Sequence, residues 1–169
     1  MTVEMDRDFL VARRFEPLVL LLGSNIGDRQ GYLKQAIAKL IEAFGTPVTN
    51  STIFETAPWG NEDQASFLNQ AIVFESNMRP MVLLETVLRI EQDLGRKRFK
   101  KWGPRVIDID IIFYGSVVYQ SDLLEIPHPY MQDRLFVLDP LAEIIPDFRH
   151  PLLDKTVSQL RTEALERHG

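Results

Sequence analysis

The order of strand-like and helix-like segments most constrains how this chain folds. Two strand-like segments, 48–55 and 67–76, follow one another with no helix-like segment between them. A doubly wound α/β fold requires strict alternation of strands and helices, so this pair excludes that fold. The order over 17–115 is strand, helix, strand, strand, helix, strand. It predicts an α+β protein with a ferredoxin-like βαββαβ core, in which an antiparallel sheet carries both helices on one face.

Apolar periodicity assigns the first segments of this core. Residues 17–22, PLVLLL, form a continuously apolar run that suits a central strand buried on both faces. Apolar residues over 33–44 then recur at helical spacing, with Asp28 as the predicted N-cap and Gly45 as the stop signal. The stretch 23–28, GSNIGD, is either a tight strand-to-helix turn or a loop that cradles phosphate, and the sequence leaves both open.

The later segments complete the core and extend it. A second helix is predicted over 81–94 and a strand over 105–114. Beyond the core we expect a hairpin over 116–126 and, in the proline-containing remainder, one helix near 156–167. The predicted fold is therefore a ferredoxin-like core with a C-terminal hairpin and a helical extension.

Composition limits the class of protein. The chain has 169 residues, which suits a single domain, predicted over 17–169 after a leader of unassigned structure over 1–16. A formal net charge of −5 gives no global attraction for nucleic acid or an anionic membrane. The absence of cysteine excludes disulfides, thiolate nucleophiles and zinc–thiolate sites. No run is long enough to span a membrane and no signal peptide is visible, so we expect a cytoplasmic protein.

Two aspartates interrupt the last core strand. Asp108 and Asp110 are two apart, so their carboxylates share one face of the strand, while Ile107, Ile109 and Ile111 point into the core. Two unpaired carboxylates side by side repel each other and lose solvation, so a cation must compensate them. The pair is either a solvated strand face paired with Lys or Arg, or a site for a hard cation such as Mg²⁺.

A basic loop directly precedes these aspartates. It holds six cations and no acid between residues 96 and 105, although the chain as a whole is acidic. Six cations exceed what two aspartates can pair with, and Gly103-Pro104 fixes a turn that sets Arg105 at the start of the strand. A solubilising surface loop is the ordinary alternative for such a charge run. Carboxylates, metal and several cations together favour a receptor for a polyphosphate, as phosphoryl transfer requires.

Several stretches resemble one known family. LLLGSNIGDR, ETAPWGNEDQASFLNQAI, RIEQDLGRKR, KWGPRVIDIDII and IPHPYMQDRLFVLDPLAEI are similar, in this order, to motifs of the 6-hydroxymethyl-7,8-dihydropterin pyrophosphokinase family, over about 17 to 150. The resemblance implies a ferredoxin-like core and a Mg²⁺-dependent enzyme of folate biosynthesis. Such an enzyme transfers the pyrophosphoryl group of ATP to the hydroxymethyl group of the reduced pterin and releases AMP. Its implied partners are these two small molecules, with no nucleic acid, membrane or obligate protein partner.

The resemblance also implies roles for individual residues. Asp108 and Asp110 would hold two Mg²⁺ ions, and the loops 56–66 and 96–104 would close over the substrates. Arg96 and Arg105 would contact the polyphosphate and favour transfer. The implied ATP-binding residues are Glu91, Arg96, Arg98, Lys101, Arg105, His128 and Arg134. The implied pterin-binding residues are Thr56, Trp59, Phe67, Asn69, Trp102 and Phe136, with the ring stacked between Phe67 and Phe136.

Two other classes of function compete with this interpretation. Ferredoxin-like folds also bind single-stranded RNA, and residues 96–102 mix Phe99 and Trp102 with basic residues. The chain lacks the aromatic signature of RNA-binding strands, however, and is acidic overall. The paired aspartates would also suit another Mg²⁺-dependent nucleotide transferase. Only the pterin-like block 56–69 argues against that alternative, and it does so through the resemblance.

Overall fold

The computed structural model describes residues 14–57, 66–95 and 106–168. The core elements are β1 (Glu16–Ser24), α2 (Arg29–Phe44), β2 (Thr49–Asn50), β3 (Phe54–Thr56), β4 (Phe67–Ser76), α3 (Pro80–Asp93) and β5 (Asp108–Tyr114). The hairpin strands β6 (Tyr119–Gln120) and β7 (Glu125–Ile126), a short 3-10 helix η1 (Met131–Asp133), α4 (Leu135–Ile144) and α5 (Val157–His168) follow. This order confirms the predicted ferredoxin-like core with a hairpin and a helical extension.

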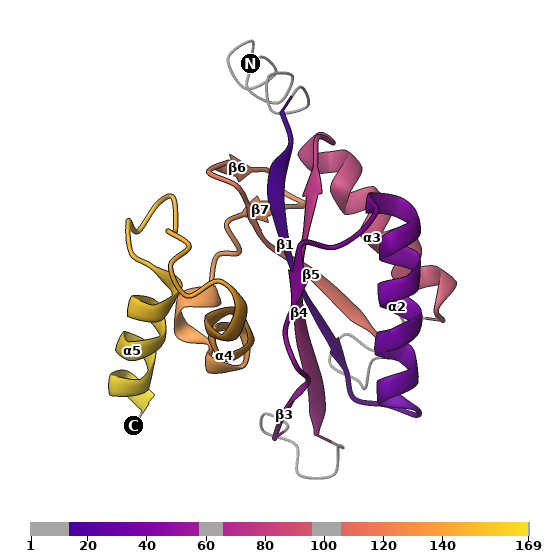
Figure 1. The fold of residues 1–169 in the computed structure, drawn as a ribbon, viewed down its shortest axis with the longest axis horizontal. Helices are drawn as coiled ribbons and strands as arrows, with labels where there is room; N and C mark the ends of the chain where they lie inside the picture. Colours follow the sequence, from indigo (N-terminus) through magenta and orange to yellow (C-terminus); the bar gives the residue numbers. More distant parts are fainter. Residues whose placement is uncertain (1–13, 58–65, 96–105, 169) are drawn as a thin grey trace.

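The main sheet has the order β2-β4-β1-β5, with β3 also paired to β4, and these strand pairs are all antiparallel. Helices α2 and α3 cover one face, as predicted, and α4 and α5 cover the other (Figure 1). The central strand β1 is therefore buried on both sides, which explains its continuously apolar sequence. Its alternate side chains enter two separate cores, one beneath α2 and α3 and one beneath α4 and α5.

Local signals set the ends of α2 as the sequence predicts. Asp28 caps the helix, because its Oδ1 accepts the N–H of Gly31 at 3.1 Å. Gly45 ends it with a φ of 88°, a conformation that favours glycine, and donates its N–H to the carbonyl of Ile41 at 2.8 Å. The strand β1 begins at Glu16, one residue inside the segment predicted as a leader.

Two predictions differ from the structure. The segment 48–55 is not one strand, because it divides into β2 and β3 around Ser51, whose buried hydroxyl accepts the N–H of Ala71. The sequence also predicts only one helix after residue 127, whereas α4 is a second. Pro140 lies inside α4 and has no backbone N–H to donate. Because proline disfavours a helix interior, the sequence did not predict this helix. Burial of Val137 and Leu138 against the sheet stabilises the helix despite that loss.

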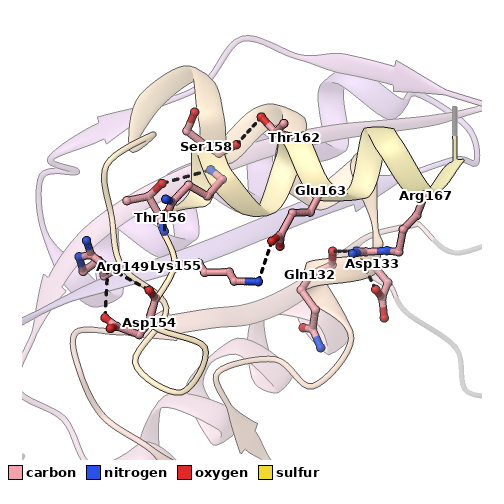
Figure 2. A network of polar contacts seen from close by, with 11 residues as sticks. Gln132, Asp133, Arg149, Asp154, Lys155, Thr156, Ser158, Thr162, Glu163 and Arg167 are labelled. Atoms are coloured by element: carbon pink, nitrogen blue, oxygen red, sulfur yellow. Dashed lines mark hydrogen bonds and ion pairs between the residues drawn. The ribbon is translucent and has the colours of Figure 1, made fainter.

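Polar contacts tie the C-terminal helix α5 to the segment before α4. Arg167 donates to the carbonyl of Gln132 and to Asp133, both at 2.9 Å (Figure 2). Lys155, which lies two residues before α5, pairs with Glu163 of that helix at 2.6 Å. In the described part of the chain no helix is long and apolar enough to cross a membrane.

Candidate active site

A row of residues across one end of the sheet brings two groups of predicted site residues together. Gly23 of β1 pairs with Asn69 of β4 on one side and with Asp108 of β5 on the other. Two residues along β1, Leu21 pairs with Asp110 and packs in the core beneath α4 and α5. Directly opposed residues of antiparallel strands share a face, so both aspartates lie on the α4 side. At about 4.8 Å per strand, the backbones of Asn69 and Asp108 are about 10 Å apart.

The aspartate pair has the strand geometry that the sequence predicts. Asp108 is half-buried and Asp110 is exposed, while Ile109 between them is 5% exposed and packs beneath α2 and α3. Ile107 and Ile111 join the same core. The isoleucines therefore fix the strand, and the carboxylates lie on its opposite face.

Both aspartates line a cleft of about 570 Å³ at the outer edge of β5. Helix α3 forms one wall, and the hairpin residues 120–125 form another. His128 and Pro129, which follow the hairpin, complete the lining. Two carboxylates and an imidazole therefore line one cleft, beside the start of β5.

Glu91 of α3 also lines the cleft and is 2% exposed. Its Oε2 accepts the backbone N–H of Ile109 at 2.7 Å, which satisfies a donor on the free edge of β5. This bond accounts for the presence of an acidic residue on the apolar face of α3. It joins the backbone between Asp108 and Asp110 to α3.

His128 is held by two backbone hydrogen bonds. Its N–H donates to the carbonyl of Ile112 at 3.0 Å, and its Nδ1 accepts the N–H of Tyr130 at 3.3 Å. Because Nδ1 accepts, the neutral ring carries its proton on Nε2 and can donate it. Burial, helped by the nearby Arg134 cation, lowers the pKa of His128 from 6.5 to about 4. The ring is therefore a neutral hydrogen-bond donor at physiological pH.

Arg134 lies over two aromatic rings. Its Cζ is 5.5 Å from the centroid of the Tyr130 ring and 5.8 Å from that of Phe136. Phe136 belongs to α4 and is half-buried against the core beneath that helix. The arrangement connects a predicted ATP-binding residue, Arg134, with a predicted pterin-stacking residue, Phe136.

The remaining described pterin residues gather where β3 and β4 meet. Asn69 is 4% exposed and donates its Nδ2 to the hydroxyl of Thr56 at 2.9 Å. Phe67 pairs with Thr56 in the β3–β4 ladder and is half-buried. A Cβ on Gly23 would lie 3.2 Å from Oδ1 of Asn69 and 3.9 Å from Phe67. The absence of a side chain at Gly23 therefore leaves the surface between Asn69 and Asp108 open.

Other predictions have different outcomes. Trp59, Arg96, Arg98, Lys101, Trp102 and Arg105 lie outside the described residues, as do most of the predicted lids. The stretch 23–28 has the geometry of a tight strand-to-helix turn, in which Gly27 has a φ of 66° and its carbonyl accepts the N–H of Arg29. Its alternative role in cradling phosphate stays a prediction.

The donor set of the cleft fits Mg²⁺. Within the described ranges no group of three or more His, Cys, Asp or Glu residues is placed to hold a metal ion. Two carboxylates on one face, in an open cleft, suit a cation that keeps most of its shell for water and phosphate oxygens, as Mg²⁺ does. The same residues would not form the closed four-ligand cage of a structural zinc site.

Sequence reasoning missed part of the cleft. The hairpin residues 120–125 line it, yet nothing in their sequence distinguishes them from an ordinary turn. Tyr130 carries both the Nδ1 contact to His128 and the ring contact to Arg134. The signal that could have identified Tyr130 was its position, as an exposed aromatic residue between His128 and Arg134.

The fold and the cleft define a ferredoxin-like protein whose exposed groups suit phosphate chemistry. A sequence profile of the 7,8-dihydro-6-hydroxymethylpterin-pyrophosphokinase family matches residues 19–146, which end before α5. The chain belongs to this family. It is a pyrophosphokinase that transfers the pyrophosphoryl group of ATP to the hydroxymethyl group of the reduced pterin in folate synthesis, so its partners are small molecules.

Individual relatives agree with this assignment. The chain is 49% identical over 126 residues to the 2-amino-4-hydroxy-6-hydroxymethyldihydropteridine pyrophosphokinase of Bacillus subtilis, covering 74% of this chain and 75% of that one. It is 42% identical over 142 residues to the enzyme of the same name from Aquifex aeolicus, covering 84% and 88%. The crystal structure of Plasmodium falciparum HPPK-DHPS with pteroate has a TM-score of 0.73 at 16% identity, over 91% of this chain and 45% of that chain. This last likeness concerns the fold of under half of the Plasmodium chain.

Proposed function

We propose that pyrophosphoryl transfer takes place on the α4 side of the sheet, across the row formed by Asn69, Gly23 and Asp108. The supporting observation is this row itself, because it sets a predicted pterin residue and a predicted metal residue on either side of an open glycine. ATP would occupy the cleft beside β5 with its phosphates toward Asp108 and Asp110. The pterin would lie over β3 and β4, between Phe67 and Phe136.

The metal is part of the same proposal. Asp108 and Asp110 would hold Mg²⁺, two ions in the arrangement that the family resemblance implies. When bound, the metal would neutralise phosphate charge and leave the β-phosphorus open to attack. The exposure of Asp110 and the partial exposure of Asp108 support this role, since ligand oxygens and water can reach both.

The chain's own residues would bind and orient the reactants. His128 would donate its Nε2 proton to a phosphate oxygen without carrying a charge, and Arg134 would add a cation near the same group. Arg96, Arg98, Lys101 and Arg105 would supply further cations from the basic loop. Glu91 would act through the backbone of Ile109, by holding the aspartates in place. Thr56, Asn69, Trp59 and Trp102 would contact the pterin.

The reaction itself would be a direct in-line displacement. The hydroxymethyl oxygen of the pterin forms a bond to the β-phosphorus while the bond from that phosphorus to the α,β-bridging oxygen breaks. AMP leaves with the bridging oxygen, and the hydroxyl proton passes to solvent. Positioning and charge stabilisation provide the catalysis, so no covalent intermediate with the protein is needed.

Product analysis tests this proposal. The protein is mixed with ATP, Mg²⁺ and 6-hydroxymethyl-7,8-dihydropterin, and the nucleotides and pterins are separated by chromatography. We expect AMP and the pterin diphosphate in equal amounts, and no product when Mg²⁺ is chelated. Formation of ADP, or AMP release that does not depend on the pterin, would show that the proposed displacement is wrong.

A further inference from the structure

Arg29 occupies the first position of α2, where a cation is unfavourably placed. The N-terminus of a helix carries partial positive charge, which repels a guanidinium. The N-cap carboxylate of Asp28 offsets part of that charge, and the first turn itself contains no acidic residue. The side chain turns away from the helix and contacts the hairpin formed by β3 and β4. Its Nη1 lies 2.8 Å from the carbonyl oxygen of Ser66, 3.0 Å from the Ser66 hydroxyl and 3.2 Å from Oε2 of Glu55.

These contacts form a closed network. The Ser66 hydroxyl also donates to Oε2 of Glu55 at 2.9 Å, so Arg29, Glu55 and Ser66 each contact the other two. Thr56 and Phe67 form the last pair of the β3–β4 ladder; Glu55 lies just inside this pair and Ser66 just beyond it. The network therefore joins three parts of the chain, the start of α2, the end of β3 and the start of β4.

The neighbours of this network are pterin-side residues. Thr56 directly follows Glu55, and Phe67 directly follows Ser66. The hydroxyl of Thr56 then accepts the amide of Asn69. A displacement of Glu55 or Ser66 would therefore move the adjacent residue, Thr56 or Phe67. Movement of Thr56 would in turn move Asn69 through their hydrogen bond.

The physical effect of the network is mainly geometric. Charge-assisted hydrogen bonds from a guanidinium are short and directional. The side chains of Arg29 and Glu55 are 29% and 55% exposed, so solvent screens their ion pair and limits what it adds to stability. A partly exposed pair that stabilises the fold little can still determine where the backbones next to it lie.

We propose that Arg29 is a positioning residue for the pterin side of the site, which it sets by holding the end of the β3–β4 hairpin against the start of α2. The proposal rests on the proposed function, because it takes Thr56, Phe67 and Asn69 as the residues that bind the pterin. Arg29 itself contacts neither substrate. Its loss should weaken pterin binding and leave the nucleotide cleft, on the other side of β1, unchanged.

The test compares Arg29→Met with Lys34→Met. The first keeps the aliphatic stem and removes the donors. The second removes the same charge from an exposed position on the same helix and serves as the matched control. Binding of the reduced pterin is followed by its fluorescence, in the presence of Mg²⁺ and an ATP analogue whose α,β-bridging oxygen is a methylene group, so that no transfer occurs. Binding of the analogue is measured separately by calorimetry.

We expect the Kd for the pterin to rise about five- to twentyfold in Arg29→Met, since displacements near 1 Å have large effects on bound geometry. The Kd for the analogue should change by less than about twofold, and Lys34→Met should match the wild type in both. Because the network acts as a unit, Arg29→Met combined with Ser66→Ala should weaken pterin binding no more than Arg29→Met alone.

Two results would overturn the proposal. One is a pterin Kd in Arg29→Met equal to that of Lys34→Met. The other is an equal loss of pterin and analogue binding, which would mean general loss of structure. Wild-type product formation separates this failure from failure of the proposed function. If the wild type makes the pterin diphosphate and Arg29→Met binds pterin normally, the function stands and only the positioning role is wrong.

Discussion

The buried carboxylate of Glu91 gives the sharpest test of how the site is built. Replacing Glu91 by alanine removes the acceptor for the Ile109 N–H, and a buried donor left unsatisfied costs about 1–3 kcal/mol. Loss of two buried methylenes adds about 1–1.6 kcal/mol, and relief from burying a charge offsets part of the sum. We expect Glu91→Ala to be destabilised by about 2–4 kcal/mol. For a chain of this size that lowers the Tm by roughly 4–16 °C.

Glu91→Gln is the matched variant. Glutamine keeps both methylenes and an oxygen that accepts the Ile109 N–H, so we expect a loss of about 1 kcal/mol or less. Urea unfolding gives the free energies of unfolding, and AMP formation at 25 °C gives the activities. If Glu91 acts by positioning β5, Gln retains most of the activity and Ala loses it along with stability.

Two outcomes separate the possible roles of Glu91. Equal destabilisation by Gln and Ala would refute the reasoning from the hydrogen bond, because only Ala removes the acceptor. A stable Gln variant whose KM for ATP rises as far as that of Ala would show instead that the negative charge itself serves the nucleotide site.

Three further predictions concern the site. Asp110→Asn should fold normally, because Asp110 is exposed, and should lower the rate of AMP formation on the order of 100-fold; undiminished turnover would exclude it as a metal ligand. Gly23→Ala should raise the KM for the pterin without changing that for ATP, because its Cβ would lie 3.2 Å from Oδ1 of Asn69; equal changes in both would contradict this. His128 should titrate near pH 4 in NMR spectra of the free protein, and a midpoint near 6.5 would show that burial does not control its charge.

The lowered pKa of His128 also predicts how stability depends on pH. Below pH 6.5 the unfolded chain binds the proton first, so the contribution of His128 is complete above that pH and is lost as the pH falls toward 4. The ring is half-buried, so solvent screening reduces the contribution to about 1–2 kcal/mol. His128→Gln should flatten the fall in the free energy of unfolding over this interval. Burial lowers the pKa of His150 as well, so part of the slope should remain in that variant.

Most of the core was predictable because each element carries a local signal. The apolar run of β1, the capping aspartate of α2 and the alternation around Asp108 and Asp110 all identify their structures directly. Helix α4 was not predictable in this way, because burial stabilises it against the effect of Pro140. In α4 the local preference of the sequence opposes a helix, and tertiary packing nevertheless stabilises one.

The site was less predictable than the fold. Asp108, Asp110 and Glu91 were recognisable as acids among apolar neighbours. The row that joins Asn69 to Asp108 depends on the pairing of three strands separated by about 40 residues each, and no local sequence encodes that register. The contacts of Arg29 depend in the same way on the packing of α2 beside the β3–β4 hairpin. Such juxtapositions follow from the assembled sheet.

The row across β1 sets a fixed distance between the two substrate sites. The interval between Asn69 and Asp108 is set by two inter-strand spacings, which hydrogen bonds hold to a narrow range whatever the surrounding loops do. A pterin with one extra methylene before its hydroxyl would carry its oxygen beyond the phosphorus, and one without the methylene would fall short. Discrimination by the length of the acceptor arm would therefore be a property of the sheet, and substitutions in the surrounding loops should leave it unaltered.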